Sequence, residues 1–433
     1  MRRHAGMVAT LILAVISPLA ATPAAATTTT GTANSVVRWD RNAQTAIWDV
    51  AQQQPWEQGR SFAMVNGAVY DAVNAIAGKP YQPYLISPRT TGRESVDAAV
   101  ATAAYRVLDA LFPAQADRLS EQYGQELAGI PEGPAKRGGI AVGTRTAAAM
   151  IAARQNDGSD GDQQWVIGTE PGEWRPTPPT FTAAGAMTPF IRPYLIPNAA
   201  MFRTAGPLPL GSTGYATEFN EIKQVGAVNS TTRTPDQTEA AIWWHDRHVT
   251  EWEIKRQLAQ SRRLTVLQTA RMFAMTDLTV ADTGIACFDD KRAWSFWRPV
   301  SAIQLAGTDG NPGTSPDPDW MPLLVTPPFP DHPSGHTCAT AARMAIWRTV
   351  LGSDRIAFHA YSEATGTTRY FHSFSEAVNE VVSARVWGGI HFRTASLQGK
   401  QLGDATSAYV SAHYFKKLHT QPPPVVEAQF QQP

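Results

Sequence analysis

The sequence predicts an all-α protein built from two packed helical bundles. Apolar residues recur at helical spacing along most of the chain, as at Phe62, Val65, Val69 and Val73. We find no convincing alternation of apolar and polar residues that would indicate strands, and no internal repeat at a fixed period. A chain of 433 residues is long enough to bury a large core, in one domain or in two closely packed ones.

Helical patterns fill most of the first half, beginning at about residue 38. Pro113 ends one of these patterns, because proline lacks the backbone N–H that a helix interior needs. The turn cluster Asn156-Asp157-Gly158 ends another, which is long and rich in alanine. The expected helices of this half span about 61–76, 96–112, 115–129 and 135–155.

Residues 159–212 are predicted to form a long loop, because closely spaced prolines exclude long helices. A long irregular stretch inside a folded protein is often functional. Two interpretations stay open. In one, the loop covers the mouth of a pocket that Trp165, Trp174 and Phe181 line. In the other, it is an arm that wraps over the helices.

The second half is again helical from about 236 to 304, with breaks, followed by a loop rich in glycine and proline up to His332. Three more helices are expected at about 335–351, 374–387 and 395–415. We therefore divide the folded chain into an N-terminal helical region, 38–235, and a second helical bundle, 236–418.

The two ends of the chain are expected to lie outside the fold. Residues 1–26 resemble an export signal, with a basic start, an apolar stretch from Met7 to Leu19 and a small-residue cleavage site at 24–26. A disordered leader over 27–37 and a disordered tail over 419–433 follow from their composition. We expect a secreted or periplasmic protein without a membrane span, and the export route stays open between the general and the twin-arginine pathways.

The overall charge argues against nucleic acid as a partner. Lysine and arginine together number 37, as do aspartate and glutamate, so the formal net charge is zero. A neutral chain has no general attraction to phosphate backbones, and any positive potential must be local.

The first candidate for chemistry is Pro333-Ser334-Gly335-His336, which precedes an apolar helical run. Ser334 is a good N-cap, and Gly335 lets the backbone approach a ligand closely. Free N–H groups at a helix start bind anions, and His336 can exchange a proton near neutral pH. A capped helix with an incidental histidine is the alternative.

Lys291 and Arg298 form the second block. Seven residues are close to two helical turns, so both side chains leave the same face, and Pro299 ends the helix after Arg298. Trp294 and Trp297 surround these charges with apolar bulk. Two basic residues snorkelling near a helix end would give the same pattern.

The third block contains Arg385 and His391. Arg385 falls on the apolar face formed by Val378, Val381 and Val382, where an arginine usually meets a buried partner or an anionic ligand. His391 alone also fits a core histidine bonded to a carbonyl. Taken together, the three cations have no matching set of carboxylates in these segments. A bound oxyanion would supply the missing negative charge.

Two further pairs stay open at this level. Cys287 and Cys338 each lie close to a candidate residue in the sequence, so they form either a disulfide or two buried free thiols. His245 and His248 are one helical turn apart, and we interpret them as part of a solvated helix face rather than as a metal pair.

These blocks, in this order, resemble the vanadium-dependent haloperoxidase and type 2 phosphatidic acid phosphatase superfamily. The matching pattern is Lys291 with Arg298-Pro299, then Pro333 to His336, then Arg385 with His391, and the resemblance covers about 236–415. It implies a bacterial haloperoxidase-like branch with the two-bundle fold of haloperoxidases and acid phosphatases.

The resemblance also implies roles. His391 would bond the vanadium of vanadate, or act as the nucleophile of a phosphatase, and His336 would be the general acid and base. The remaining residues would bind the oxygens of vanadate or phosphate: Lys291, Arg298, Ser334, Gly335 and Arg385. Phe329 and Trp297 are halide-site candidates by similarity to haloperoxidases.

Two positions depart from the family pattern. Ala384 replaces a serine before Arg385, and Ala395 replaces an aspartate that would orient the imidazole of His391. Losing that aspartate harms a histidine nucleophile more than a histidine ligand, which favours haloperoxidase over phosphatase.

We therefore expect a haloperoxidase that uses hydrogen peroxide, halide and a small organic substrate, with vanadate as cofactor. An acid phosphatase acting on phosphate monoesters through a phosphohistidine is the alternative, and a non-catalytic anion-binding protein is a third. A homo-oligomer stays open.

Overall fold

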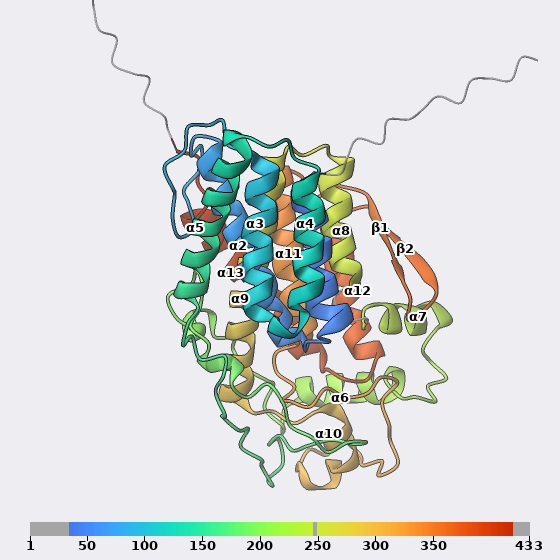
Figure 1. Cartoon of the computed structure of the whole chain (residues 1–433). Helices are drawn as coiled ribbons and strands as arrows, with labels where there is room; N and C mark the ends of the chain where they lie inside the picture. The colour runs from blue at the N-terminus through green and yellow to red at the C-terminus, as the bar shows by residue number, and fades with distance from the viewer. Residues whose placement is uncertain (1–33, 246–248, 419–433) are drawn as a thin grey trace, which may run out of the picture. The chain divides into compact units, whose positions relative to one another are not determined.

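The computed structural model describes residues 34–245 and 249–418, and the predicted all-α class is confirmed. Long helices run side by side, with the short helices α6 and α10 at one end (Figure 1). None of the described helices is long and apolar enough to cross a membrane. The α-helices are α1 Ser35–Gln44, α2 Pro55–Ile76, α3 Val96–Leu111, α4 Ala116–Ala128, α5 Pro134–Ala153, α6 Thr213–Val225, α7 Pro235–Trp243, α8 Val249–Ser261, α9 Val266–Trp294, α10 Pro299–Gln304, α11 Gly335–Leu351, α12 Phe374–Trp387 and α13 Arg393–His413.

The chain folds earlier than the predicted leader allows. Asn34 caps α1 by accepting a hydrogen bond from the N–H of Val37, and Val36 and Val37 are buried. The expectation of disorder up to residue 37 is therefore wrong from Asn34 onward. The apolar side chains of this short stretch join the core, which composition alone did not indicate.

One apolar core crosses the predicted boundary at residues 235 and 236. It joins side chains of α1 to α5 with those of α8, α9, α11 and α12. The long helix α9 packs against α2 of the first half and against α11 and α13 of the second. Helix α9 therefore fixes the position of the second-half segments relative to the first.

Close packing of α13 on α11 fixes the loop that precedes α11. A Cβ atom at Gly399 would lie 2.8 Å from the carbonyl oxygen of Ser334 and 2.7 Å from Oγ1 of Thr337. Only glycine permits this approach without a shift of the backbone. The start of α11 is thus held directly against a neighbouring helix.

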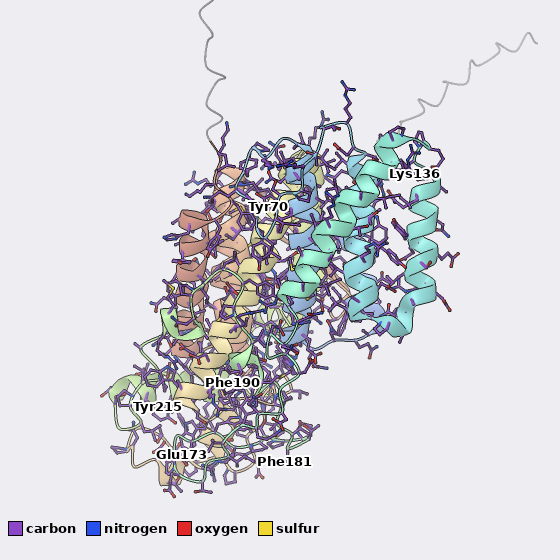
Figure 2. The ribbon with its side chains drawn as sticks, turned by 60° about the vertical axis from the view of Figure 1, so that its left-hand side comes forward. Tyr70, Lys136, Glu173, Phe181, Phe190 and Tyr215 are labelled. Carbon is purple, nitrogen blue, oxygen red and sulfur yellow. The ribbon has the colours of Figure 1, made fainter. Side chains whose placement is uncertain are left out.

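The loop 159–212 contains only two short 3₁₀ turns, η3 Thr188–Phe190 and η4 Ala199–Phe202, as the prolines predict. Asp282 of α9 holds it by accepting the backbone N–H groups of Tyr194, Leu195 and Ile196 at 2.6 to 2.8 Å. Phe181 projects from the far part of the loop and is 64% exposed (Figure 2).

One antiparallel hairpin contradicts the expectation of no strands. Strand β1, Phe358–Ser362, pairs with β2, Thr367–Phe371, in the register Phe358 opposite Phe371. The pattern in β1 alternates between buried and exposed. Five residues are too few for this alternation to stand out from helical sequence on both sides, which is why the hairpin was missed.

Candidate active site

Lys291 lies near the end of α9 with its ammonium group fully buried. Its Nζ donates to the backbone carbonyl oxygens of Pro330, Asp331 and Pro333, at 2.9, 3.0 and 2.5 Å. Burial lowers its pKa to about 8. An ammonium group has three protons, so Lys291 shapes the loop before α11 in this structure, and its predicted contact with oxyanion oxygens stays a prediction.

Arg298 is the N-cap residue of α10, and its guanidinium lies in the same buried region. Its Nε donates to the carbonyl oxygen of Phe329 at 2.8 Å and its Nη1 to that of Ile390 at 2.7 Å. Its Nη2 is buried without a hydrogen-bond partner. Burial lowers the pKa of Arg298 to about 10. One donor group is therefore left for a ligand.

Arg385, in the last turn of α12, is fully buried as its place on an apolar face predicted. Its Nη1 donates to the carbonyl oxygen of Trp244 at 3.3 Å, and its Nη2 lies 3.2 Å from Nδ1 of His245. Its Nε has no hydrogen-bond partner. Burial, reinforced by the charge of Arg298, lowers the pKa of Arg385 to about 9. No described carboxylate forms an ion pair with it.

The start of α11 presents two further groups of the predicted cradle. Ser334 occupies the N-cap position, but its hydroxyl makes no capping bond, and its Oγ is buried without a partner. A Cβ atom at Gly335 would meet no atom within 4 Å. There is therefore open space beside the backbone of Gly335, as close approach of a ligand requires.

His391 is the point at which the predicted residues converge. Burial moves its pKa well below the ordinary value, and the charges of Arg298, Lys291 and Arg385, together with His336, act in the same direction. The other four predicted charged or imidazole side chains therefore all act on His391. Arg298 Nη1 lies 3.2 Å from Nε2 of His391.

Asp331 is a site residue that the sequence analysis missed. Its Oδ1 lies 2.8 Å from Nδ1 of His391 and 3.8 Å from Nη1 of Arg298, and its side chain is fully buried. Burial raises its pKa to about 7, although Arg298 and Lys291 oppose the rise. It supplies the carboxylate that Ala395 lacks. The only sequence signal was an acidic residue two positions before Pro333.

His245 is the second residue that was missed, and its assignment to a solvated helix face is wrong. Its ring stacks on that of His336, with 5.9 Å between the ring centroids, and it contacts Arg385. His248 lies outside the described residues. In the described chain, no group of three His, Cys, Asp or Glu side chains is arranged to hold a metal ion.

The two halide-site candidates differ in position. Phe329 lies against the cations, with its ring centroid 5.1 Å from Nζ of Lys291 and 5.1 Å from Cζ of Arg298. Trp297 is fully buried in an apolar cluster with Tyr215 and Phe296. Phe329 therefore borders the site, whereas the side chain of Trp297 packs behind it.

Cys287 and Cys338 also come together, as free thiols. Both are buried, and a hydrogen bond between the two side chains contributes to lowering the pKa of Cys287 and raising that of Cys338. Of the two alternatives at the sequence level, the structure has the free thiols.

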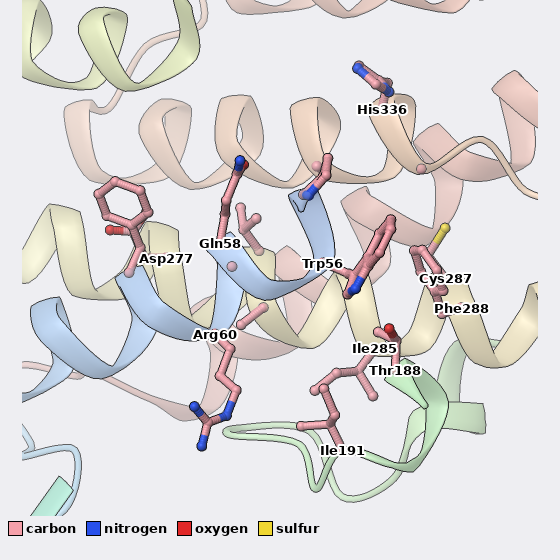
Figure 3. A pocket seen from close by; sticks show the side chains of 18 of the residues that line it. Trp56, Gln58, Arg60, Thr188, Ile191, Asp277, Ile285, Cys287, Phe288 and His336 are labelled. Atoms are coloured by element: carbon pink, nitrogen blue, oxygen red, sulfur yellow. The ribbon is translucent and has the colours of Figure 1, made fainter. Parts of the chain in front are cut away.

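A cavity of about 100 Å³ adjoins the start of α11. Its wall includes Gly335, His336 and Phe329, together with residues of α2, α9 and the loop 159–212 (Figure 3). Trp165 and Trp174 of that loop pack against Phe288 and Phe329, behind this wall. The loop is thus part of the pocket, although its tip at Phe181 is not.

Comparison with known proteins shows what the segment that carries this site is similar to. Residues 271–420 match the family model of the VCPO second helical-bundle domain. A segment of 138 residues, 25% of this chain, is 31% identical to the vanadium chloroperoxidase of Curvularia inaequalis and spans 22% of that protein's length. The segment that carries this site is therefore similar to the second helical bundle of vanadium chloroperoxidases.

Solved structures extend the similarity to most of the fold. A bacterial vanadium-dependent iodoperoxidase superposes with a TM-score of 0.74 at 23% identity, covering 89% of this chain and 95% of that one. A bacterial vanadium-dependent chloroperoxidase in its holo form superposes with a TM-score of 0.64 at 18% identity, covering 86% of this chain and 96% of that one. At these identities the similarity establishes the fold.

Proposed function

We propose that this protein is a vanadate-dependent haloperoxidase, which uses hydrogen peroxide to oxidise halide and thereby halogenates a small organic substrate. The observation that carries the proposal is a set of buried donors without partners on three of the predicted site residues: Nη2 of Arg298, Nε of Arg385 and Oγ of Ser334. A buried donor without a partner costs about 1–3 kcal/mol, and more when it is charged. An oxyanion would satisfy all three.

Vanadate fits this donor set. Its oxygens accept hydrogen bonds from guanidinium and hydroxyl groups, its negative charge offsets buried cations, and its metal takes a histidine nitrogen. Arg298, Arg385, Ser334 and the backbone at Gly335 would hold the oxygens, and Nε2 of His391 would bond the metal. Bound vanadate supplies a Lewis acid that activates peroxide towards halide.

The chain's own residues prepare this chemistry. Asp331 Oδ1 lies 2.8 Å from Nδ1 of His391 without an aligned hydrogen bond in this structure. By accepting that N–H, the carboxylate would fix the tautomer and leave a lone pair on Nε2. His336, at the start of α11 and bordering the cavity, is placed to give and take protons at the substrate side. Lys291 holds the intervening loop through its carbonyl groups.

An acid phosphatase is the second candidate, and one observation favours it. A histidine nucleophile needs a carboxylate to orient it, and Asp331 provides one. The absence of an aspartate at Ala395 therefore no longer argues against a phosphatase. The haloperoxidase names of the relatives and the apolar cavity beside His336 support the first candidate.

Two assays on the same purified protein separate these activities. After incubation with orthovanadate, we expect triiodide formation from iodide and peroxide, and bromination of a phenolic dye. Both should be lost in His391→Ala and kept in His413→Ala, which changes an exposed histidine of α13. Hydrolysis of p-nitrophenyl phosphate by vanadate-free protein, lost in His391→Ala and without any peroxidase activity, would establish the phosphatase instead.

We also propose that the protein is exported after removal of residues 1–26. The basic start, apolar stretch and small-residue site support this. Mass spectrometry of protein secreted by a bacterial host should give a chain that begins near residue 27, and an intact N-terminus on protein kept inside the cell would contradict it.

A further inference from the structure

The cavity beside His336 has the size and the walls for one aromatic ring. Its volume is about 100 Å³, comparable with an engineered cavity of about 150 Å³ that binds benzene. Trp56, Phe288 and Phe329 form an aromatic wall, with ring centroids 5.1 to 6.0 Å apart. Figure 3 shows Trp56 of α2 facing Phe288 and Cys287 of α9. Such a wall favours a flat apolar ligand.

The cavity offers no attraction to a charged ligand, because the acidic and basic side chains in its wall are already paired. Asp277 accepts from Lys255 at 2.8 Å, Arg343 donates to Glu251 at 2.6 Å, and Arg60 donates to Asp157 at 2.9 Å. Within the described chain, these are the ionisable wall residues other than His336, Cys287 and Tyr194, whose hydroxyl donates to the carbonyl oxygen of Arg60. The occupant is therefore expected to be neutral.

Three wall residues carry buried polar atoms without partners. Gln58, 2% exposed, donates from Nε2 to the carbonyl oxygen of Gln53 at 2.7 Å, which fixes the amide and leaves its Oε1 as an acceptor without a donor. Thr188, 1% exposed, has an unpartnered Oγ1. Nε1 of Trp56 is a third such atom. An apolar cavity with unsatisfied hydrogen-bonding atoms is matched by a ring that carries a hydroxyl group.

We propose that this cavity binds a neutral phenol, with its hydroxyl donating to Oε1 of Gln58 and its ring beside His336, and that the bound phenol is the organic substrate. The proposal rests on the haloperoxidase function above. In the overall step, halide loses two electrons to hydrogen peroxide, whose O–O bond breaks. A ring C–H bond is replaced by a carbon–halogen bond. Two water molecules leave. They contain the two oxygens and two hydrogens of the peroxide, the ring proton and one further proton.

Gly284 of α9 allows the cavity to be filled without disturbing its wall. It lines the cavity, and a Cβ atom there would meet no atom within 4 Å. Gly284→Leu therefore projects a side chain into the space that the ring needs. Gly124→Leu is the matched control, because Gly124 lies on the exposed face of α4 and its Cβ position is equally open. Gln58→Leu removes the acceptor Oε1 and keeps a side chain of similar size.

Binding is measured by calorimetry on protein without vanadate or peroxide, with phenol as the probe and benzoate as the charged comparison. We expect saturable one-to-one binding of phenol and none of benzoate. Gly284→Leu should weaken phenol binding at least tenfold and Gln58→Leu about five- to tenfold, while Gly124→Leu has no effect. With vanadate present, the ratio of phenol halogenation to triiodide formation should fall in both cavity variants.

Each result decides between binding and catalysis. Triiodide formation without saturable phenol binding would overturn the phenol site and leave the haloperoxidase function standing. Phenol binding that Gly284→Leu and Gln58→Leu do not weaken would place the ligand elsewhere and overturn the site as well. Phenol binding without triiodide formation, with both variants weakened, would keep the site but refute its role in halogenation.

Discussion

Asp331 Oδ1 lies 2.8 Å from Nδ1 of His391, although one residue precedes α11 and the other follows α12. The carboxylate that orients the imidazole therefore comes from a different segment than the family pattern indicates. Lys291 holds the loop that contains Asp331, because its ammonium group donates to carbonyl oxygens of that loop. The segment that contains this carboxylate is thus held by one buried cation.

Asp331→Asn should weaken vanadate binding about 10- to 100-fold, because the partner of Nδ1 that fixes the tautomer of His391 is lost. Vanadate dissociation constants are measured by calorimetry in phosphate-free buffer. Asp71→Asn is the control, since Asp71 is also a buried aspartate, one that accepts backbone N–H groups of Tyr84, Leu85 and Ile86. Equal affinities for Asp331→Asn and wild type would contradict the assignment.

Arg385→Met should stabilise the protein in the absence of an oxyanion and weaken vanadate binding at least tenfold. Replacing a buried charge that lacks a carboxylate by an apolar group of similar size raises stability by about 1–4 kcal/mol. Urea unfolding in anion-free buffer measures this. Arg343→Met, which removes the partner of buried Glu251, should instead destabilise by about 3–5 kcal/mol. A change in the free energy of unfolding with the same sign in Arg385→Met and Arg343→Met would contradict this prediction.

Asp282→Ala should release the loop 159–212 from α9. Three backbone N–H groups lose their acceptor, and each buried unsatisfied donor costs about 1–3 kcal/mol. We expect at least about 3 kcal/mol of destabilisation and faster proteolytic cleavage within the loop. Asp404→Ala, which breaks an exposed pair with Lys400, should change stability by less than about 1 kcal/mol. Unchanged cleavage in Asp282→Ala would show that other contacts hold the loop.

His332 should make stability fall in acid. Burial, with a contribution from Lys291, lowers its pKa to about 3 from the model-compound value of 6.5. Between these values the unfolded chain binds a proton that the folded chain does not, so stability is complete above about 6.5 and declines as the pH falls towards 3, by up to about 1.4 kcal/mol per pH unit. His332→Gln should show a shallower slope in urea unfolding across this range. An identical slope would exclude His332 as the source.

Cys287 and Cys338 should both react with iodoacetamide after unfolding and neither in the native state, because both thiols are free and buried. Intact mass before and after alkylation counts the modified thiols. The experiment uses protein secreted into an oxidising compartment and purified without reductant. A mass two hydrogens lower, with no alkylation, would reveal a disulfide instead.

The positions of most helices were predictable from the sequence, because they depend on local spacing. The expectation of Lys291 and Arg298 on one helix was wrong, because α9 ends at Trp294 and Arg298 is the N-cap residue of α10. Apolar periodicity marked the helices of both halves, and Arg385 was conspicuous as a charge on an apolar face. The hairpin was missed because β1 and β2 have five residues each, and their order depends on packing against α8 and α12.

Contacts between distant segments were not predictable. Asp331 becomes the partner of His391, and His245 reaches Arg385, only through tertiary packing, and neither has a spacing that indicates it. The family pattern puts the orienting carboxylate four residues after His391, where Ala395 stands. The predicted group of cations was found together, but the protons of Lys291 are directed to the backbone.

The three carbonyl contacts of Lys291 mean that the loop before α11 has its shape before any ligand arrives. Binding of vanadate should therefore cause little rearrangement of the backbone in this loop. The empty and loaded forms of the protein should exchange amide hydrogens in this loop at similar, slow rates.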